Sequence, residues 1–224
     1  SDLSKQEFWD ALPDVMYHMD EPLGDASAVA LYFLSKEAAG HVKVVLSGEG
    51  ADELFGGYNI YREPEALKKV AWIPFVLRRA VRKLAAKLPD VKGRDFLIRA
   101  GMKVEERFIG NAYIYCEKEK AQILKNKVTG PSTQEYLSQF YEELESENRD
   151  SLQDMEKMQS VDLNYWLPGD ILQKADKMSM AHSLEVRVPF LDKEVFNFAA
   201  KLPKEAKIAA GTTKYIFRKA VSKF

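Results

Sequence analysis

The sequence has few of the residues that build disulfides and metal sites. Its 224 residues include one cysteine, Cys116, and three histidines. A single cysteine excludes a disulfide within the chain and a CxxC metal pair, and it is typical of proteins in a reducing cytoplasm. The histidines, His18, His41 and His182, are far apart and lack the spacing of an HExxH zinc site. We therefore predict structural or surface roles for these four side chains.

The chain also lacks a long apolar run and an excess of one charge. No stretch approaches the roughly 20 apolar residues that span a bilayer, and the N-terminus lacks the charged-then-apolar pattern of a signal peptide. The formal net charge is -1, whereas a general nucleic-acid binder usually carries a basic excess. We therefore expect a cytoplasmic protein that binds neither a membrane nor nucleic acid.

The composition is that of a folded domain. Hydrophobic residues make up 46% of the chain and charged residues 30%, which is enough apolar material for a core. The first residues are typical of a helix start in mid-protein, and residues 217–224 are typical of a helix without a stop signal. From both ends we expect a portion of a longer protein.

Apolar residues at helical spacing predict that most of the chain is helical. Ser4, with Glu7 three residues later, predicts a capping box at the first helix. Pro74 is expected to divide one helical stretch into two pieces. The predicted helices cover 4–17, 26–39, 64–88, 92–108, 134–147 and 151–167, and the predicted loops are 18–25 and 125–133. The basic residues within 78–87 are expected to form a solvated helix face.

One strand is predicted over 42–46, which is short, β-branched and bounded by Gly40 and Gly48. A helix, a strand and a glycine-containing turn indicate an α/β unit with a parallel sheet. Residues 1–60 are expected to be the C-terminal part of this unit, and 61–224 a helical region of the same domain. Because few other strands are predicted, we expect the partners of this strand upstream of the sequence or in a second chain.

The segment after the strand combines glycines with acids. Gly48 and Gly50 allow backbone amides to approach a ligand closely. A helix is expected to begin near Ala51, and amides near a helix start favour phosphate. The same turn holds three acids, Glu49, Asp52 and Glu53.

These acids would repel a bare polyphosphate. A magnesium ion removes this repulsion because it can coordinate carboxylate and phosphate oxygens at the same time. The glycines do not form a Rossmann fingerprint, since Glu53 stands in place of the third glycine, and the Walker lysine is absent. The turn therefore indicates a magnesium–nucleotide site, with a structural glycine turn capped by acids as the alternative.

Four segments carry a resemblance to a known family. Residues 47–58, SGEGADELFGGY, resemble the signature of the asparagine synthetase C-terminal domain. The other segments are 20–25, 176–181 continuing into 184–192, and 214–218. They occur in the family's order, and the region from about 60 to 150 carries little of the signal. The resemblance implies an α/β, mostly helical fold: a truncated adenine-nucleotide alpha-hydrolase-like (ATP-pyrophosphatase) domain with at least one remaining parallel-type strand.

The resemblance also implies an ATP-dependent, amide-forming ligase. In that family the side-chain carboxylate of aspartate attacks the α-phosphate of Mg-ATP, which gives β-aspartyl-AMP and pyrophosphate. Ammonia, released from glutamine by a separate N-terminal domain, then displaces AMP and forms asparagine. The implied cofactors are ATP and Mg²⁺, and the implied partners are aspartate and ammonia or glutamine.

The resemblance implies a role for each residue that occupies a functional position of the family's motifs. Ser47 and Gly48 would contact the nucleotide, and Asp52 would hold magnesium at the pyrophosphate. Glu49 resembles the residue proposed to take a proton from the attacking ammonia. Lys214 resembles the lysine that stabilises charge at the departing pyrophosphate. The acyl-adenylate end would be shaped by Asp176, Lys177, Glu185 and Arg187.

Some of these residues have a structural alternative. Glu185 and Arg187 could pair with other helices, and Asp20 and Asp25 could belong to a loop that braces the nucleotide turn. The substrate also stays open, because similar domains occur in β-lactam synthetases, cyclases and amidotransferases that act on other carboxylates. A non-catalytic assembly domain is the alternative of another class.

Two parts of the family's pattern have no match. Neither the SGGxDS loop of the ATP site nor the glutaminase domain with its N-terminal cysteine is present, and Cys116 is internal. We therefore predict that this chain alone neither hydrolyses glutamine nor makes asparagine. Because an exposed strand edge favours pairing with another chain, we also expect a homodimer that covers it.

Overall fold

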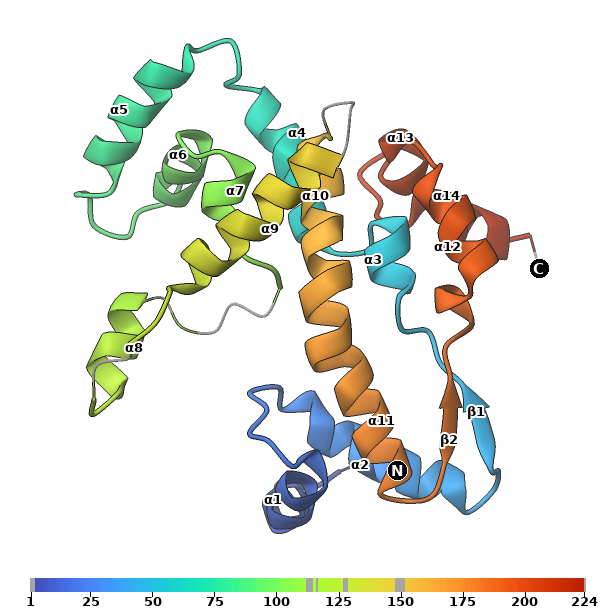
Figure 1. Ribbon diagram of the computed structural model, residues 1–224. Helices are drawn as coiled ribbons and strands as arrows, with labels where there is room; N and C mark the ends of the chain where they lie inside the picture. The colour runs from blue at the N-terminus through green and yellow to red at the C-terminus, as the bar shows by residue number, and fades with distance from the viewer. Residues whose placement is uncertain (1–2, 112–114, 116, 127–128, 148–151, 224) are drawn as a thin grey trace.

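The computed structural model describes the chain except residues 1–2, 112–114, 116, 127–128, 148–151 and 224 (Figure 1). Cys116, for which the sequence predicts a structural role, lies outside the described residues. The structure is mostly helical with a small parallel sheet. This confirms the predicted mostly helical α/β class.

The chain begins with two helices that pack together. α1 (Lys5–Met19) starts at Ser4, where the predicted capping box is formed: the Glu7 amide donates to Ser4 Oγ at 3.2 Å and the Ser4 amide to Glu7 Oε2 at 2.9 Å. α1 runs two residues beyond the predicted end, because Met19 is buried in the core shared with α2 (Ser27–Ala39) and Met178. The packing of Met19 therefore extends the helix into the predicted loop.

A continuous helical run crosses the molecule over 154–180 (Figure 1). It consists of α10 (Asp154–Val161), the π-helical η2 (Asp162–Leu172) and α11 (Gln173–Met180). The predicted helix over 151–167 ends just before Pro168, but the run continues past it. Over η2 the hydrogen bonding widens to the π pattern, which carries the helix through the proline instead of ending it.

The sheet contains a strand that the sequence analysis did not identify. β1 (Val44–Leu46) pairs in parallel with β2 (Glu185–Arg187). The prediction that β1 has no partner within the sequence is therefore wrong. Residues 184–188, LEVRV, alternate apolar and charged residues, which is a strand signal, but three residues are too few to stand out. The other edge of β1 pairs with none of the residues that the structure describes.

The remaining helices lie around the helical run over 154–180 and the two-stranded sheet. Pro74 separates α4 from α5 as predicted, and the predicted helix over 92–108 is interrupted at Gly101, where a Cβ would lie 2.5 Å from the Arg78 carbonyl oxygen. The helices before α10 are α3 (Ala51–Phe55), η1 (Asn59–Arg62), α4 (Glu63–Lys68), α5 (Phe75–Ala85), α6 (Arg94–Ala100), α7 (Val104–Arg107), α8 (Glu117–Ile123) and α9 (Thr133–Glu147). Those after β2 are η3 (Pro189–Leu191), α12 (Lys193–Ala200), α13 (Lys204–Lys207) and α14 (Tyr215–Val221).

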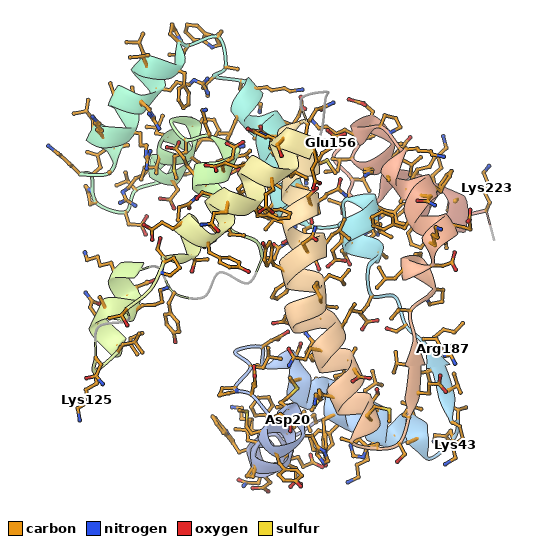
Figure 2. The ribbon with its side chains drawn as sticks, in the orientation of Figure 1. Asp20, Lys43, Lys125, Glu156, Arg187 and Lys223 are labelled. Atoms are coloured by element: carbon orange, nitrogen blue, oxygen red, sulfur yellow. The ribbon has the colours of Figure 1, made fainter. Side chains whose placement is uncertain are left out.

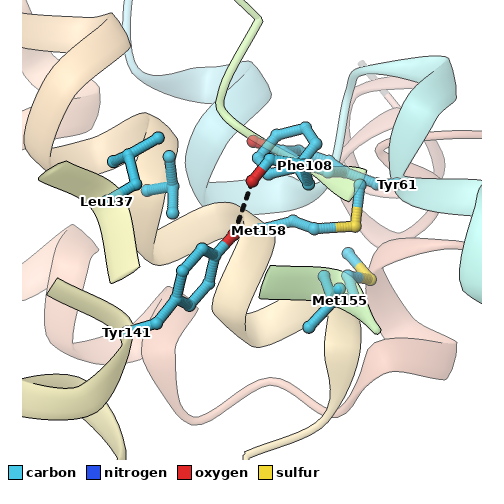
Figure 3. Close-up of a cluster of buried hydrophobic side chains, with 8 residues drawn as sticks. Tyr61, Phe108, Leu137, Tyr141, Met155 and Met158 are labelled. Atoms are coloured by element: carbon cyan, nitrogen blue, oxygen red, sulfur yellow. Dashed lines mark hydrogen bonds between the residues drawn. The ribbon is translucent and has the colours of Figure 1, made fainter. Parts of the chain in front are cut away.

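Separate apolar clusters hold these parts together. One joins α9 and α10 to the segment around Tyr61 (Figure 3), and within it Tyr141 Oη donates to the Phe108 carbonyl at 2.9 Å. Met155 and Met158 are fully buried there. Another cluster packs α3 against the C-terminal helices. It brings the turn after β1 next to α14.

Two further sequence predictions concern the whole molecule. The division into 1–60 and 61–224 stays a prediction, as does the homodimer. Among the described residues, no helix is both long enough and apolar enough to cross a membrane.

Candidate functional site

The turn after β1 is held by a backbone hydrogen bond to β2 and lies against the Leu191 side chain of η3. The Ser47 amide donates to the Arg187 carbonyl at 2.8 Å and so extends the parallel ladder. Gly50 has a φ of +86°, and a Cβ there would lie 2.3 Å from Leu191 Cδ2. Gly50 is thus required by the fold itself. Gly48 differs, since a Cβ there would meet nothing within 4 Å. The backbone at Gly48 faces open space, as a ligand contact requires.

The structure brings Asp52 and Lys214 together. Lys214 Nζ lies 2.9 Å from Asp52 Oδ2, and both side chains are partly exposed. Asp52 stands in the first turn of α3, and Lys214 immediately precedes α14. Lys214 has a φ of +50°, in the left-handed region that few non-glycine residues adopt. Such backbone strain is often found at functional positions.

Gly57 lies directly against this ion pair. A Cβ at Gly57 would lie 1.7 Å from Asp52 Oδ1 and 2.5 Å from Lys214 Cε. The two charged side chains therefore lie against the bare backbone of this glycine. Gly57 belongs to the motif at 47–58, but the sequence alone gives it no role. The paired glycines at 56–57 are the available signal.

Glu49 has a free carboxylate oxygen at the same turn. Its Oε2 is buried and has no hydrogen-bond partner among the described residues. Leaving such an atom without a donor costs about 1–3 kcal/mol. A bound ligand that donates a hydrogen bond, or a cation, would remove that cost.

Glu53 is turned away from the turn. It is 1% exposed, and Tyr58 Oη donates to its Oε1 at 2.6 Å, while Trp166 Nε1 donates to Tyr58 Oη at 3.1 Å. Burial raises the pKa of Glu53 above its usual range, although the bond from Tyr58 opposes the shift. The interpretation that three acids crowd a ligand here is therefore corrected: Glu53 faces the core, and Glu49 and Asp52 remain.

The far end of α3 is anchored to the long helical run. Gln159 Nε2 donates to the carbonyl oxygens of Glu53 and Leu54, the second at 3.2 Å. Lys207 Nζ donates to Gln159 Oε1 at 3.1 Å, and burial lowers the pKa of Lys207. These bonds satisfy carbonyls that a short helix leaves without partners. α3, which carries Asp52, is thereby fixed in orientation.

The residues predicted at the acyl-adenylate end lie on α11 and β2. Asp176 is exposed on α11, and Lys177 pairs with Asp20. Glu185 and Arg187 are exposed on β2, and Figure 2 labels Arg187 there. Arg187 Nε donates to Glu185 Oε1 at 2.6 Å. Among the described residues they pair with each other within β2.

A second ion cluster joins the segment 20–25 to the long run. Lys174, 7% exposed, pairs with Asp25 and lies 3.3 Å from Asp170 Oδ1. Burial alone would raise the pKa of Asp25, but the hydrogen bonds from Lys174 and Ser27 outweigh it and lower the pKa to about 2. This loop thus braces α2 against η2 and α11. Lys174 has no role that the sequence alone predicts.

The acids of the turn fit magnesium that arrives with a nucleotide. The described residues contain no group of three or more His, Cys, Asp or Glu side chains that could hold a metal ion. Mg²⁺ is commonly bound by one or two carboxylates together with substrate phosphates and water. The partly exposed Asp52 matches this mode, and the unpaired oxygen of Glu49 beside it stays available for a proton.

Comparisons with known proteins identify the family of the chain. A family model for asparagine synthase matches residues 1–224. The chain belongs to the asparagine synthase family. It is 48% identical over 219 residues to glutamine-hydrolyzing asparagine synthetase 1 of Bacillus subtilis (strain 168), covering 97% of this chain and 34% of that protein. It is 27% identical over 225 residues to asparagine synthetase 3 of the same strain, covering 98% of this chain and 30% of that protein.

A relative with another name also matches. Amidase chry2 of Gibberella zeae is 25% identical over 232 residues, covering 94% of this chain and 34% of that protein. The chain therefore spans about a third of the length of these relatives. Membership of the family confirms the resemblance drawn from the four sequence segments.

Proposed function

We propose that this chain forms part of the ATP site of a ligase that converts aspartate to asparagine, with ammonia released from glutamine. The observation that carries the proposal is the Asp52–Lys214 ion pair seated on Gly57. It places a carboxylate and an ammonium side by side at the end of a parallel strand, where α/β folds bind their ligands. The relatives named as asparagine synthetases support the choice of substrate.

Each residue of the turn would have its own task. Magnesium, when bound, would offset negative charge on the phosphates. Asp52 would hold the ion, and Lys214 would stabilise the charge that develops on the departing pyrophosphate. Ser47 and the open backbone at Gly48 would contact the nucleotide. Glu49 Oε2, which lacks a donor, would accept a proton from the attacking ammonia.

Asp176, Glu185 and Arg187 are proposed to shape the acyl end. Arg187 is tied to the turn because its carbonyl accepts from the Ser47 amide. Glu185 is tied to Arg187 by their hydrogen bond. Asp176 is exposed and makes no side-chain hydrogen bond with the residues that the structure describes, so it is free to meet a substrate. The cytoplasmic location and the inactivity of this chain alone stay predictions.

The test uses the full-length protein from which this sequence comes. It is incubated with aspartate, Mg-ATP and ammonia, and asparagine, AMP and pyrophosphate are measured. All three are expected, and Asp52→Ala should abolish them. Asp10→Ala, which removes an exposed acid of α1, is the matched control and should leave them unchanged.

Amidase chry2 motivates a second candidate, a ligase that acts on another carboxylate. Pyrophosphate that forms only with a different carboxylate would keep the ATP site and replace the substrate. If no carboxylate gave pyrophosphate, the non-catalytic assembly domain would be the better description. Against that last alternative stands Glu49, because an assembly domain has no use for an unpaired acid at this turn.

A further inference from the structure

Helix α3 carries Asp52 but is too short to orient it alone. The helix has five residues, Ala51–Phe55, whereas isolated helices shorter than about 12–15 residues are only marginally stable in water. The direction of the Asp52 carboxylate must therefore come from contacts with the rest of the fold. Figure 1 shows α3 between the long helical run and the C-terminal helices, and both pack against it.

The chain that leaves α3 folds back onto Asp52. Gly56 has a φ of +69°, and the Gly57 amide donates to the Asp52 carbonyl at 2.7 Å, a bond typical of helices that end at a left-handed glycine. The Asp52 carboxylate also lies against Gly57, where a Cβ would meet its Oδ1 at 1.7 Å. Gly57 thus touches both the carbonyl and the carboxylate of Asp52, so a displacement of Gly57 displaces the acid.

Tyr58, the next residue, ties this turn to α3 and to the long helical run. Its Oη donates to Glu53 Oε1 at 2.6 Å and accepts from Trp166 Nε1 at 3.1 Å. The bond to Glu53 joins residues on either side of the two glycines and so closes the segment 53–58. The single proton of the hydroxyl is donated to Glu53, which is itself 1% exposed. Neither group is therefore placed to touch a substrate.

We propose that Tyr58 and Glu53 are positioning residues for the ion pair of the turn. Their hydrogen bond holds Gly57 in place, and Gly57 sets where the Asp52 carboxylate and the Lys214 ammonium lie. The inference rests on the proposed function, because it assigns both residues to the same reaction. Precision matters there, since a misplacement of about 1 Å can lower a rate by about 10²-fold.

Other roles for Glu53 and Tyr58 account for less of the geometry. A magnesium ligand must reach the ion, whereas the Glu53 carboxylate is buried and accepts from Tyr58. A purely structural bond would duplicate an existing anchor, because Gln159 Nε2 already holds the carbonyl oxygens of Glu53 and Leu54. The bond from Tyr58 acts instead on the segment beyond the helix, which is the part that touches Asp52.

The kinetic test uses the full-length protein with aspartate, Mg-ATP and ammonia. Tyr58→Phe keeps the ring, which lies edge-on to Tyr61 at 5.6 Å between centroids, and removes only the hydroxyl. The kcat for pyrophosphate formation should fall by about 10–100-fold, while the KM values for ATP and aspartate stay unchanged. The matched control is Tyr141→Phe, which also loses one buried hydrogen bond, to the Phe108 carbonyl, and should keep wild-type kinetics. Equal kinetics in the two variants, or a change in KM alone, overturns the proposal.

Variants of Glu53 separate its hydrogen bond from its charge. Glu53→Gln keeps an oxygen that can accept from Tyr58, whereas Glu53→Ala does not. Glutamine should therefore recover most of the rate that alanine loses. If Glu53→Gln melts like the wild type but is as slow as Glu53→Ala, the charge matters and the positioning role is overturned.

Hydrogen exchange gives a readout that does not depend on activity. In full-length Tyr58→Phe, the peptide that covers 52–58 and includes the Gly57 amide should exchange about fivefold faster than in the wild type. Tyr141→Phe should leave this peptide unchanged. Wild-type exchange in Tyr58→Phe overturns the positioning role. Faster exchange in a protein whose wild type forms no pyrophosphate with any carboxylate would instead remove the proposed function and leave the hold of Tyr58 on the turn in place.

Discussion

Lys214 Nζ lies 2.9 Å from Asp52 Oδ2, although α3 and α14 come from opposite parts of the sequence. The contact exists because Phe55 stacks on Phe217 at 5.6 Å between ring centroids, which fixes one helix against the other. Because the aromatic contact fixes the two helices, the positions of Asp52 and Lys214 are set before a ligand binds. Prearranged charge is what stabilises a transition state without further reorganisation.

Lys214→Met should therefore affect catalysis far more than stability. Partly exposed ion pairs contribute no more than about 1 kcal/mol to folding, so the melting temperature should move little. Pyrophosphate formation by the full-length protein should fall by about 10²–10³-fold. Lys219→Met, within α14, is the matched control and should keep wild-type rates. A Lys214→Met variant with normal kcat would remove this residue from the mechanism.

Two glycines of the turn should respond differently to alanine. Gly57→Ala places a methyl group 1.7 Å from Asp52 Oδ1, so the ion pair must move. We expect a loss of about 1–3 kcal/mol in unfolding free energy and no measurable ligase activity. Both are measured on the full-length protein, by urea titration and by pyrophosphate release.

Gly48→Ala is the counterpart, because its Cβ would meet nothing within 4 Å. Its stability should stay within about 0.5 kcal/mol of the wild type, while the KM for ATP should rise if the nucleotide lies against this backbone. An unchanged KM would place the nucleotide elsewhere.

Local signals explain which parts of the fold the sequence predicts. The capping box at Ser4 and the helix start at Ala51 depend on neighbouring residues, and both were predicted. β2 and the passage of the helical run through Pro168 depend on distant packing, and both were missed. Gly57 belongs to the same group, since its role appears only when Lys214 arrives from the far end of the chain. The chemistry of the turn came mainly from the family resemblance.

Asp162 should make the fold less stable as the pH rises. It is 0% exposed and accepts from Tyr61 Oη at 2.5 Å and from Asn111 Nδ2 at 2.7 Å. Burial raises the pKa of Asp162 to about 6, against the lowering effect of these bonds. The unfolded chain therefore loses this proton first. The contribution of Asp162 to stability should be full below about pH 4 and decline by about 3 kcal/mol towards pH 6.

The measurement is the unfolding free energy of the chain from pH 4 to 7, with Asp162→Asn as the test variant. Asparagine cannot ionise, so this decline should disappear in the variant whatever its absolute stability. Asp154→Asn, at the start of α10, changes a carboxylate that pairs with Arg107 and should leave the decline in place. An identical slope in the wild type and Asp162→Asn would assign the decline to another group.

Asp25 should have the opposite effect on the pH dependence of stability, because its contribution is lost at acidic pH. Its hydrogen bonds from Lys174 and Ser27 overcome the effect of burial and lower its pKa to about 2. A lowered acid pKa contributes stability that is complete above the unfolded value and is lost as the pH falls through the folded one. About 2 kcal/mol should therefore disappear between about pH 4 and pH 2.

Asp25→Asn should remove this acid loss, while Asp10→Asn, at an exposed position of α1, should keep it. Lys174→Met tests the same cluster from the other side. It leaves Asp25 and the buried Asp170 without their cation, so the unfolding free energy at pH 7 should fall by about 3–5 kcal/mol. A Lys174→Met variant as stable as the wild type would mean that solvent already neutralises this cluster, and that α2 is held by its apolar contacts alone.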